Sequence, residues 1–143
     1  DLIYTQDDDY LTGGYADELI SLHKKNPEKI VAGLVAGHYL VEAHKRPWLQ
    51  LGWGSVFRKS AINVLDQYTE RFGVDDVLKR KADRIFTSLH GNHLPIQITP
   101  LRLYDPDGRR SESSKDALYM RPDHQKMTER AMERVRLLQD ECE

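Results

Sequence analysis

A nearly uniformly apolar segment at residues 29–40 restricts the fold of this chain more than any other feature. Its β-branched residues and its glycines are typical of a central strand that is buried on both faces. Another β-prone segment, at residues 3–5, precedes it, and Tyr15, Leu19 and Leu22 between the two have the spacing of a short amphipathic helix. The order of strand, helix and strand predicts an α/β fold with a layered sheet. With 143 residues, we expect one domain over 1–143.

Three consecutive aspartates, Asp7, Asp8 and Asp9, follow the first β-prone segment. Neighbouring carboxylates repel one another in a folded chain, and a bound divalent cation relieves that repulsion. A strand that ends in Asp-x-Asp therefore indicates a place for a hard metal ion and for an anionic ligand such as a diphosphate. The alternative is an ordinary turn in which one aspartate caps the following helix. Both interpretations stay open from these residues alone.

A second motif, Gly52, Trp53 and Gly54, precedes a short apolar strand at residues 55–58. Glycines let the backbone approach a ligand closely, and an indole ring offers a flat face on which a sugar ring can stack. The other interpretation is a core tryptophan in a bend that the glycines make easier.

Asp75 and Asp76 stand between two predicted helices. The first helix, residues 59–72, has an apolar stripe and ends at Gly73, which suits a C-terminal cap. The second helix continues from Val77 onward and also has an apolar face. Capping and the helix dipole favour carboxylates at a helix start, and they explain one aspartate comfortably. The alternative is that one of the pair faces a cleft as a general base for a hydroxyl nucleophile.

The rest of the chain predicts an edge strand, a loop and a final helix. Residues 94–103 alternate apolar and polar and have prolines at their margins, which indicates an edge strand. Residues 105–116 are rich in turn formers and charges, and they form either a mobile lid over a phosphate or a solvated loop. Residues 122–138 have the apolar spacing of a final helix. His90 and His93 have metal-ligand spacing, although histidines at a helix end are more often solvated.

Composition excludes several classes of protein. The net charge is −2, with 21 basic and 23 acidic residues and no long basic run, which argues against a nucleic-acid binder. The single cysteine, Cys142, allows no intrachain disulfide and no cysteine-rich metal site. The sequence predicts no membrane span and no signal peptide, and it does not define a compartment or an oligomeric state. Because a strand pattern begins within a residue or two of Asp1, we expect that N-terminal sequence is missing here.

Three segments occur together in a recognisable order, namely residues 4–9, residues 51–58, and residues 73–77 with 82–87. Together they resemble the metal-dependent, nucleotide-sugar glycosyltransferases of the GT-A fold, of the family 2-like, Asp-x-Asp type. The resemblance covers nearly the whole chain, from the Asp-x-Asp motif onward. It implies a three-layer α/β/α mixed sheet that lacks the family's N-terminal strands, which supply most of the base-binding pocket.

The resemblance also implies roles for the acidic triplet and the glycine motif. Asp9 matches the direct ligand of Mn²⁺ or Mg²⁺, and Asp7 matches the residue that meets the ribose or the water shell of the metal. Asp8 is directed toward the donor sugar. The segment of Gly52, Trp53 and Gly54 is similar to the part of the family that lines the donor-sugar and acceptor pocket.

The acidic pair and the third metal ligand are less well defined by the resemblance. Asp75 or Asp76 corresponds to the acidic residue that takes the acceptor proton in inverting members, or that lies near the anomeric carbon in retaining members. A histidine often completes the metal site in the family. His124 and Asp116 are the candidates for that third ligand here.

The function implied is transfer of a sugar from a nucleoside-diphosphate sugar, with UDP as the expected nucleotide, to a hydroxyl group of a glycan, protein or lipid acceptor. A different hypothesis is a truncated or degenerate GT-A remnant that serves as a non-catalytic binding or scaffold module, with the final helix as its partner surface. A nucleotidyltransferase is disfavoured, because no glycine-rich phosphate loop with Lys or Arg lies near the start of the sequence.

Overall fold

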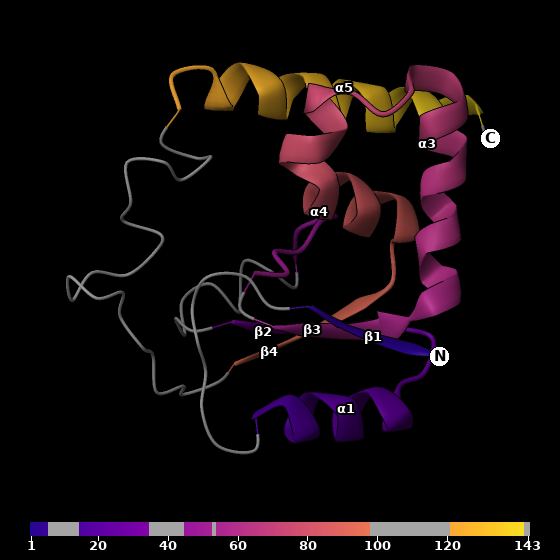
Figure 1. Cartoon of the computed structure of the whole chain (residues 1–143), viewed down its shortest axis with the longest axis vertical. Helices are drawn as coiled ribbons and strands as arrows, with labels where there is room; N and C mark the ends of the chain where they lie inside the picture. The colour runs from indigo at the N-terminus through magenta and orange to yellow at the C-terminus, as the bar shows by residue number, and fades with distance from the viewer. Residues whose placement is uncertain (6–14, 35–44, 53, 98–120, 142–143) are drawn as a thin grey trace.

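The computed structural model describes residues 1–5, 15–34, 45–52, 54–97 and 121–141, and Figure 1 shows how their helices and strands are arranged. In chain order the elements are β1 (Leu2–Thr5), α1 (Tyr15–Lys25), β2 (Ile30–Leu34), β3 (Ser55–Arg58), the 3₁₀ helix η1 (Lys59–Val64), α3 (Leu65–Phe72), α4 (Asp76–His90), β4 (His93–Gln97) and α5 (His124–Glu141). The predicted α/β class is confirmed.

The described strands form one mixed sheet in the order β1-β3-β2-β4. Strand β3 is antiparallel to both of its neighbours, whereas β2 and β4 are parallel. Ile30, Val31 and Ala32 of β2 are completely buried, as predicted for a central strand. The predicted strand after residue 93 is also confirmed and lies at an edge of the described sheet. Its predicted continuation to residue 103 falls outside the described residues.

The two faces of the sheet are covered by different helices, because successive side chains of a strand point to opposite sides. Val31 and Val56 pack against Leu19 of α1 on one face. Ile30 and Phe57 pack on the other face, in a cluster that includes Phe86 of α4. In Figure 1, α1 accordingly lies on one side of the sheet and α4 on the other.

Helix α5 forms an outer layer on α4 and does not touch the sheet cluster. Its Ala131, Val135 and Leu138 are buried against Val77 and Ile85 of α4. This is the apolar stripe predicted for the last helix, and burying a side chain such as Val135 or Leu138 contributes about 1.5–3 kcal/mol. Figure 1 shows α5 on the side of α4 that is remote from the sheet. The stripe therefore belongs to the protein's own core. If α5 is a partner surface, as the scaffold hypothesis holds, only its exposed face can contact the partner.

Most helix ends agree with the sequence, with one exception. Gly73 (φ 75°) follows α3 and Gly91 (φ 72°) follows α4, both in the positive-φ region that glycine adopts readily. The predicted single helix over residues 59–72 is wrong in its first half, which is the 3₁₀ helix η1. Arg58, at its N-terminal boundary, makes no side-chain capping bond, and the β-branched Ile62 and Val64 are weak α-helix formers.

Candidate functional site

The end of β1 is the first part of the site that the structure defines. Thr5 pairs with Ser55 across the β1/β3 ladder, and their hydroxyl groups are hydrogen-bonded to each other. Thr5 is the last described residue before the acidic triplet, and Ser55 directly follows Gly54. The register therefore brings the strand that leads into the triplet beside the glycine motif. Asp7, Asp8 and Asp9 themselves lie outside the described residues.

The glycine motif is held against the neighbouring strand. Gly54 is buried and has a φ of 112°, a backbone conformation that L side chains rarely adopt. Its N–H donates to the carbonyl of Leu51 at 3.1 Å, and its carbonyl accepts from the N–H of Gly33 at 3.0 Å. Gly52 lies half-buried in the turn before it, and Trp53 lies outside the described residues. The tight turn accounts for the need for glycine at position 54.

Asp75 is occupied by contacts within the protein. Its Oδ1 accepts a hydrogen bond from the N–H of Leu78 at 3.1 Å, which makes it the N-cap of α4. Its Oδ2 lies 2.8 Å from Nη1 of Arg134, which also donates to the hydroxyl of Tyr68. Burial alone would raise the pKa of Asp75, but the hydrogen bonds from Arg134 and Leu78 outweigh it and hold the pKa below its usual value. A carboxylate with a depressed pKa is a weak base, so Asp75 is poorly suited to general-base work.

Asp76 differs from its neighbour. It is exposed in the first turn of α4 and makes no hydrogen bond or ion pair with the other described residues. Ten residues separate Asp76 from Phe86, where α4 meets the sheet cluster. At about 1.5 Å of rise per residue this is roughly 15 Å of helix. Figure 1 shows the first turn of α4 close to α5, and no described contact joins the acidic pair to Gly52 or Gly54.

His124 is the first residue of α5 and contacts α4, while Asp116, the other candidate for the third metal ligand, lies outside the described residues. The Nδ1 atom of His124 lies 2.8 Å from Nζ of Lys81. Burial lowers the pKa of His124, and so do the charges of Lys81 and the neighbouring arginines. The resolved parts of the chain contain no group of three or more His, Cys, Asp or Glu residues that could hold a metal ion.

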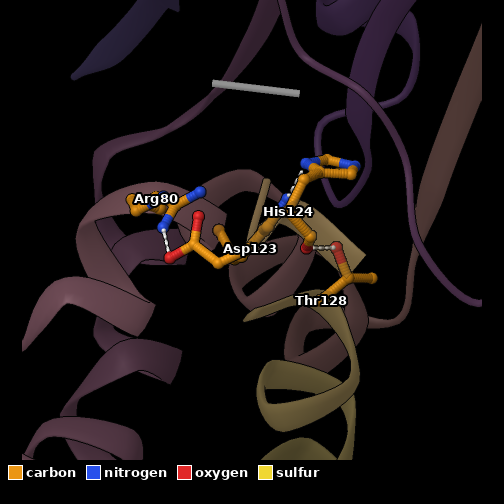
Figure 2. A network of polar contacts seen from close by, with 5 residues as sticks. Arg80, Asp123, His124 and Thr128 are labelled. Atoms are coloured by element: carbon orange, nitrogen blue, oxygen red, sulfur yellow. Dashed lines mark hydrogen bonds and ion pairs between the residues drawn. The ribbon is translucent and has the colours of Figure 1, made fainter. Parts of the chain in front are cut away.

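A group of cations around His124 was not predicted from the sequence. Lys81 is only 6% exposed, and α4 departs from helical geometry there, with φ −126° and ψ 27°. Arg80 pairs with Asp123, whose Oδ2 lies 2.6 Å from its Nη1 (Figure 2). The guanidinium of Arg84 lies 3.6 Å from the centre of the Trp48 ring. The sequence signal was three cations within five residues of one helix, a pattern that usually indicates a solvated face.

No protein-family model, curated protein or solved structure matches this chain. The described residues form a mixed α/β structure, with helices on both faces of a sheet of four described strands. Within the described part of the chain, no helix combines the length and the apolar character that crossing a membrane requires.

Proposed function

We propose that this chain is the catalytic region of a metal-dependent glycosyltransferase with a GT-A-like fold. It would transfer a sugar from a nucleoside-diphosphate sugar, with UDP as the nucleotide, to a hydroxyl acceptor. The observation that carries the proposal is the pairing of Thr5 with Ser55. Two motifs that lie nearly fifty residues apart in the sequence, the acidic triplet and the glycine motif, each adjoin this one pair of residues.

The chemistry of the acidic triplet fits this reaction. Asp7 and Asp9 would hold Mn²⁺ or Mg²⁺, because carboxylate oxygens are the ligands that such hard cations prefer. When bound, the cation neutralises the charge that develops on the departing diphosphate. The glycine motif would let the backbone approach the donor sugar, although at Gly54 the tight turn by itself already requires a glycine.

Asp76 is the better candidate of the acidic pair for the catalytic base. Its carboxylate is exposed and makes no hydrogen bond to the described residues, whereas Asp75 is engaged by Leu78 and Arg134. A base must reach the hydroxyl proton that it removes. Because that hydroxyl attacks the anomeric carbon of the donor, the proposal requires the donor sugar to reach from the glycine motif to the first turn of α4.

The sheet is compatible with a larger GT-A domain. Among the described strands β1 has a single neighbour, β3. In the glycosyltransferases that the chain resembles, the Asp-x-Asp strand is a central one. Pairing of further strands with β1 would give it that position.

A thermal-shift measurement on the full-length natural chain tests the function. We expect Mn²⁺ together with UDP to raise the melting temperature, because a ligand that binds only the folded state stabilises it. Asp9→Asn should abolish the rise. Asp17→Asn is the matched control, since Asp17 is an exposed carboxylate on α1 and should leave the rise unchanged. Absence of a metal-dependent rise in the unaltered protein would overturn the proposal.

Measurements on the same protein distinguish the enzyme from the non-catalytic scaffold. A degenerate remnant would neither bind UDP with metal nor release UDP from a UDP-sugar in the presence of acceptor. The apolar stripe of α5 is buried on α4, so a scaffold that used this helix as its partner surface would present the exposed face of α5.

A further inference from the structure

We propose that a basic cluster at the kink of α4 is a binding site for a tetrahedral oxyanion, such as a phosphate or sulfate group. The α4 basic cluster consists of Arg80, Lys81 and Arg84 of α4 and His124 of α5. It lies where the first turn of α5 crosses α4, and no residue of the acidic triplet or the glycine motif belongs to it. The inference therefore stands on different residues from the proposed glycosyl transfer, with the exception of His124, which the resemblance offered as a third metal ligand.

Lys81 is the most deeply buried member of the cluster. Burying an ammonium group is costly unless an anion or several acceptors compensate it. The described partner of Lys81 is the neutral-type acceptor Nδ1 of His124, at 2.8 Å, and no described carboxylate lies within ion-pair distance of its Nζ. Burial lowers the pKa of Lys81, and the positive charges of Arg84 and Arg80 lower it further. The carboxylates of Asp83 and Asp123 partly offset these charges, but neither forms an ion pair with Nζ of Lys81.

Arg80 shows where an anion would bind. Its side chain is 11% exposed, and Nη1 is paired with Asp123. Its Nε and Nη2 atoms are buried and have no hydrogen-bond partner among the described residues. In Figure 2 one guanidinium nitrogen faces Asp123, and another points away from it. Buried N–H groups without acceptors are rare in folded proteins, and an unseen ion is one of the accepted explanations.

The geometry of the unpaired atoms selects the class of ligand. The Nε and Nη2 atoms form one edge of the guanidinium, and their N–H groups are parallel donors that match two oxygens of a phosphate, sulfate or carboxylate. Asp123 directly precedes α5 and occupies that helix end with a carboxylate, so the donors come from the side chains of α4. Lys81, the next residue after Arg80, adds an ammonium group to the cluster. A guanidinium edge together with an ammonium group is a donor set that phosphate and sulfate groups accept.

Arg84 links the cluster to a spectroscopic reporter. Its guanidinium stacks on Trp48, which Arg46 also contacts at 4.8 Å from the ring centre. Burial lowers the pKa of Arg84, which Asp83 partly offsets. An anion bound in the cluster should attract the Arg84 guanidinium, and this should change the environment of the Trp48 indole. Trp53 is the only other tryptophan, so Trp53→Phe isolates the signal of Trp48.

The test is a titration of the Trp53→Phe protein with inorganic phosphate, sulfate, pyrophosphate and UDP, in EDTA and at constant ionic strength. We expect a saturable change in Trp48 fluorescence with at least one of these anions. Arg80→Gln should weaken that binding at least tenfold. Lys79→Gln is the matched control, because Lys79 is an exposed cation on the same helix, and it should bind as the parent does. Lys81→Met provides a second variant, and circular dichroism and melting curves establish that each variant is folded.

The arms of the titration distinguish the source of the oxyanion. Equal affinity for phosphate and UDP indicates a site for free phosphate, whereas much tighter binding of UDP or pyrophosphate indicates a site for a diphosphate. Either result supports the inference if Arg80→Gln weakens it. The inference is overturned if no anion binds saturably, or if folded Arg80→Gln and Lys79→Gln proteins bind as the parent does. Because EDTA is present, these outcomes are independent of the metal-dependent test of glycosyl transfer.

Discussion

At the scale of single residues, the side chains with the most unusual environments in the described part of the chain are buried cations and histidines. His23 on α1 is 2% exposed, and its Nε2 has no partner among the described residues. Lys81 is nearly as buried on the opposite face of the sheet. Burial lowers the pKa of both groups, which couples their protonation to folding.

The burial of His23 predicts how the free energy of unfolding depends on pH. Burial lowers the pKa of His23 below its usual 6.5, and the charge of Arg58 lowers it further. Between the folded pKa and 6.5 the unfolded chain binds more protons than the folded one, so the free energy of unfolding falls as the pH falls through that window. We expect His23→Leu to reduce this fall without abolishing it, because the pKa values of His90, His93 and His124 are also lowered.

Urea denaturation at a series of pH values checks this expectation. Well above pH 6.5 the unaltered protein and His23→Leu differ only by packing, and that difference is the baseline. Below it, the gap should change in favour of the variant. A gap that stays constant across the whole range would show that His23 titrates alike in the folded and unfolded states.

At the scale of elements, local patterns were predictable and distant contacts were not. Gly73 at the end of α3 and the capping of α4 by one aspartate, as one of two alternatives, follow from the sequence, since a cap depends on a few neighbouring residues. The pairing of Thr5 with Ser55 does not, because the order of strands in a sheet depends on contacts across the whole chain. The burial of Lys81 also escapes prediction, since it depends on α5, some forty residues later.

Within the candidate site, the roles of the acidic pair also depend on a distant contact that the sequence does not predict. The sequence offered capping or catalysis for Asp75 and Asp76 without choosing between them. The choice of Asp75 as cap comes with a partner, Arg134, that lies 59 residues away. No local signal identifies such a partner, and the interpretation of the site changes once it is known.

Asp75→Ala tests the cap of α4. It removes the acceptor for the Leu78 N–H, which typically costs about 0.5–2 kcal/mol of stability, and it leaves Arg134 without its carboxylate. Asp75→Asn keeps a capping oxygen and should cost less. Asp76→Ala is the matched control and should change the free energy of unfolding by less than about 0.5 kcal/mol, since that side chain is exposed. Equal losses from Asp75→Ala and Asp76→Ala in urea denaturation would contradict the capping role.

At the scale of the whole molecule, α4 connects the two halves of the protein. Its Phe86 belongs to the cluster on the sheet, and its Val77 and Ile85 belong to the cluster shared with α5. The sheet has its own cover on the other face in α1. Both the first turn of α4 and the α4 basic cluster are therefore positioned by the docking of α5 as well as by the sheet. A loss of α5 docking should disturb them while leaving the pairing of Thr5 with Ser55 in place.

Two adjacent leucines of α5 test this arrangement. Leu138 is 4% exposed within the cluster on α4, whereas Leu137 is 42% exposed. Leu138→Ala should lower the free energy of unfolding by about 2–5 kcal/mol, because it removes buried apolar contacts and leaves a cavity. Leu137→Ala should change it by about 0.5 kcal/mol or less. Because both changes are Leu→Ala at neighbouring helical positions, helix propensity cancels in the comparison and packing alone remains. Urea denaturation followed by circular dichroism measures the difference, and similar losses in the two variants would show that α5 does not dock on α4 through this face.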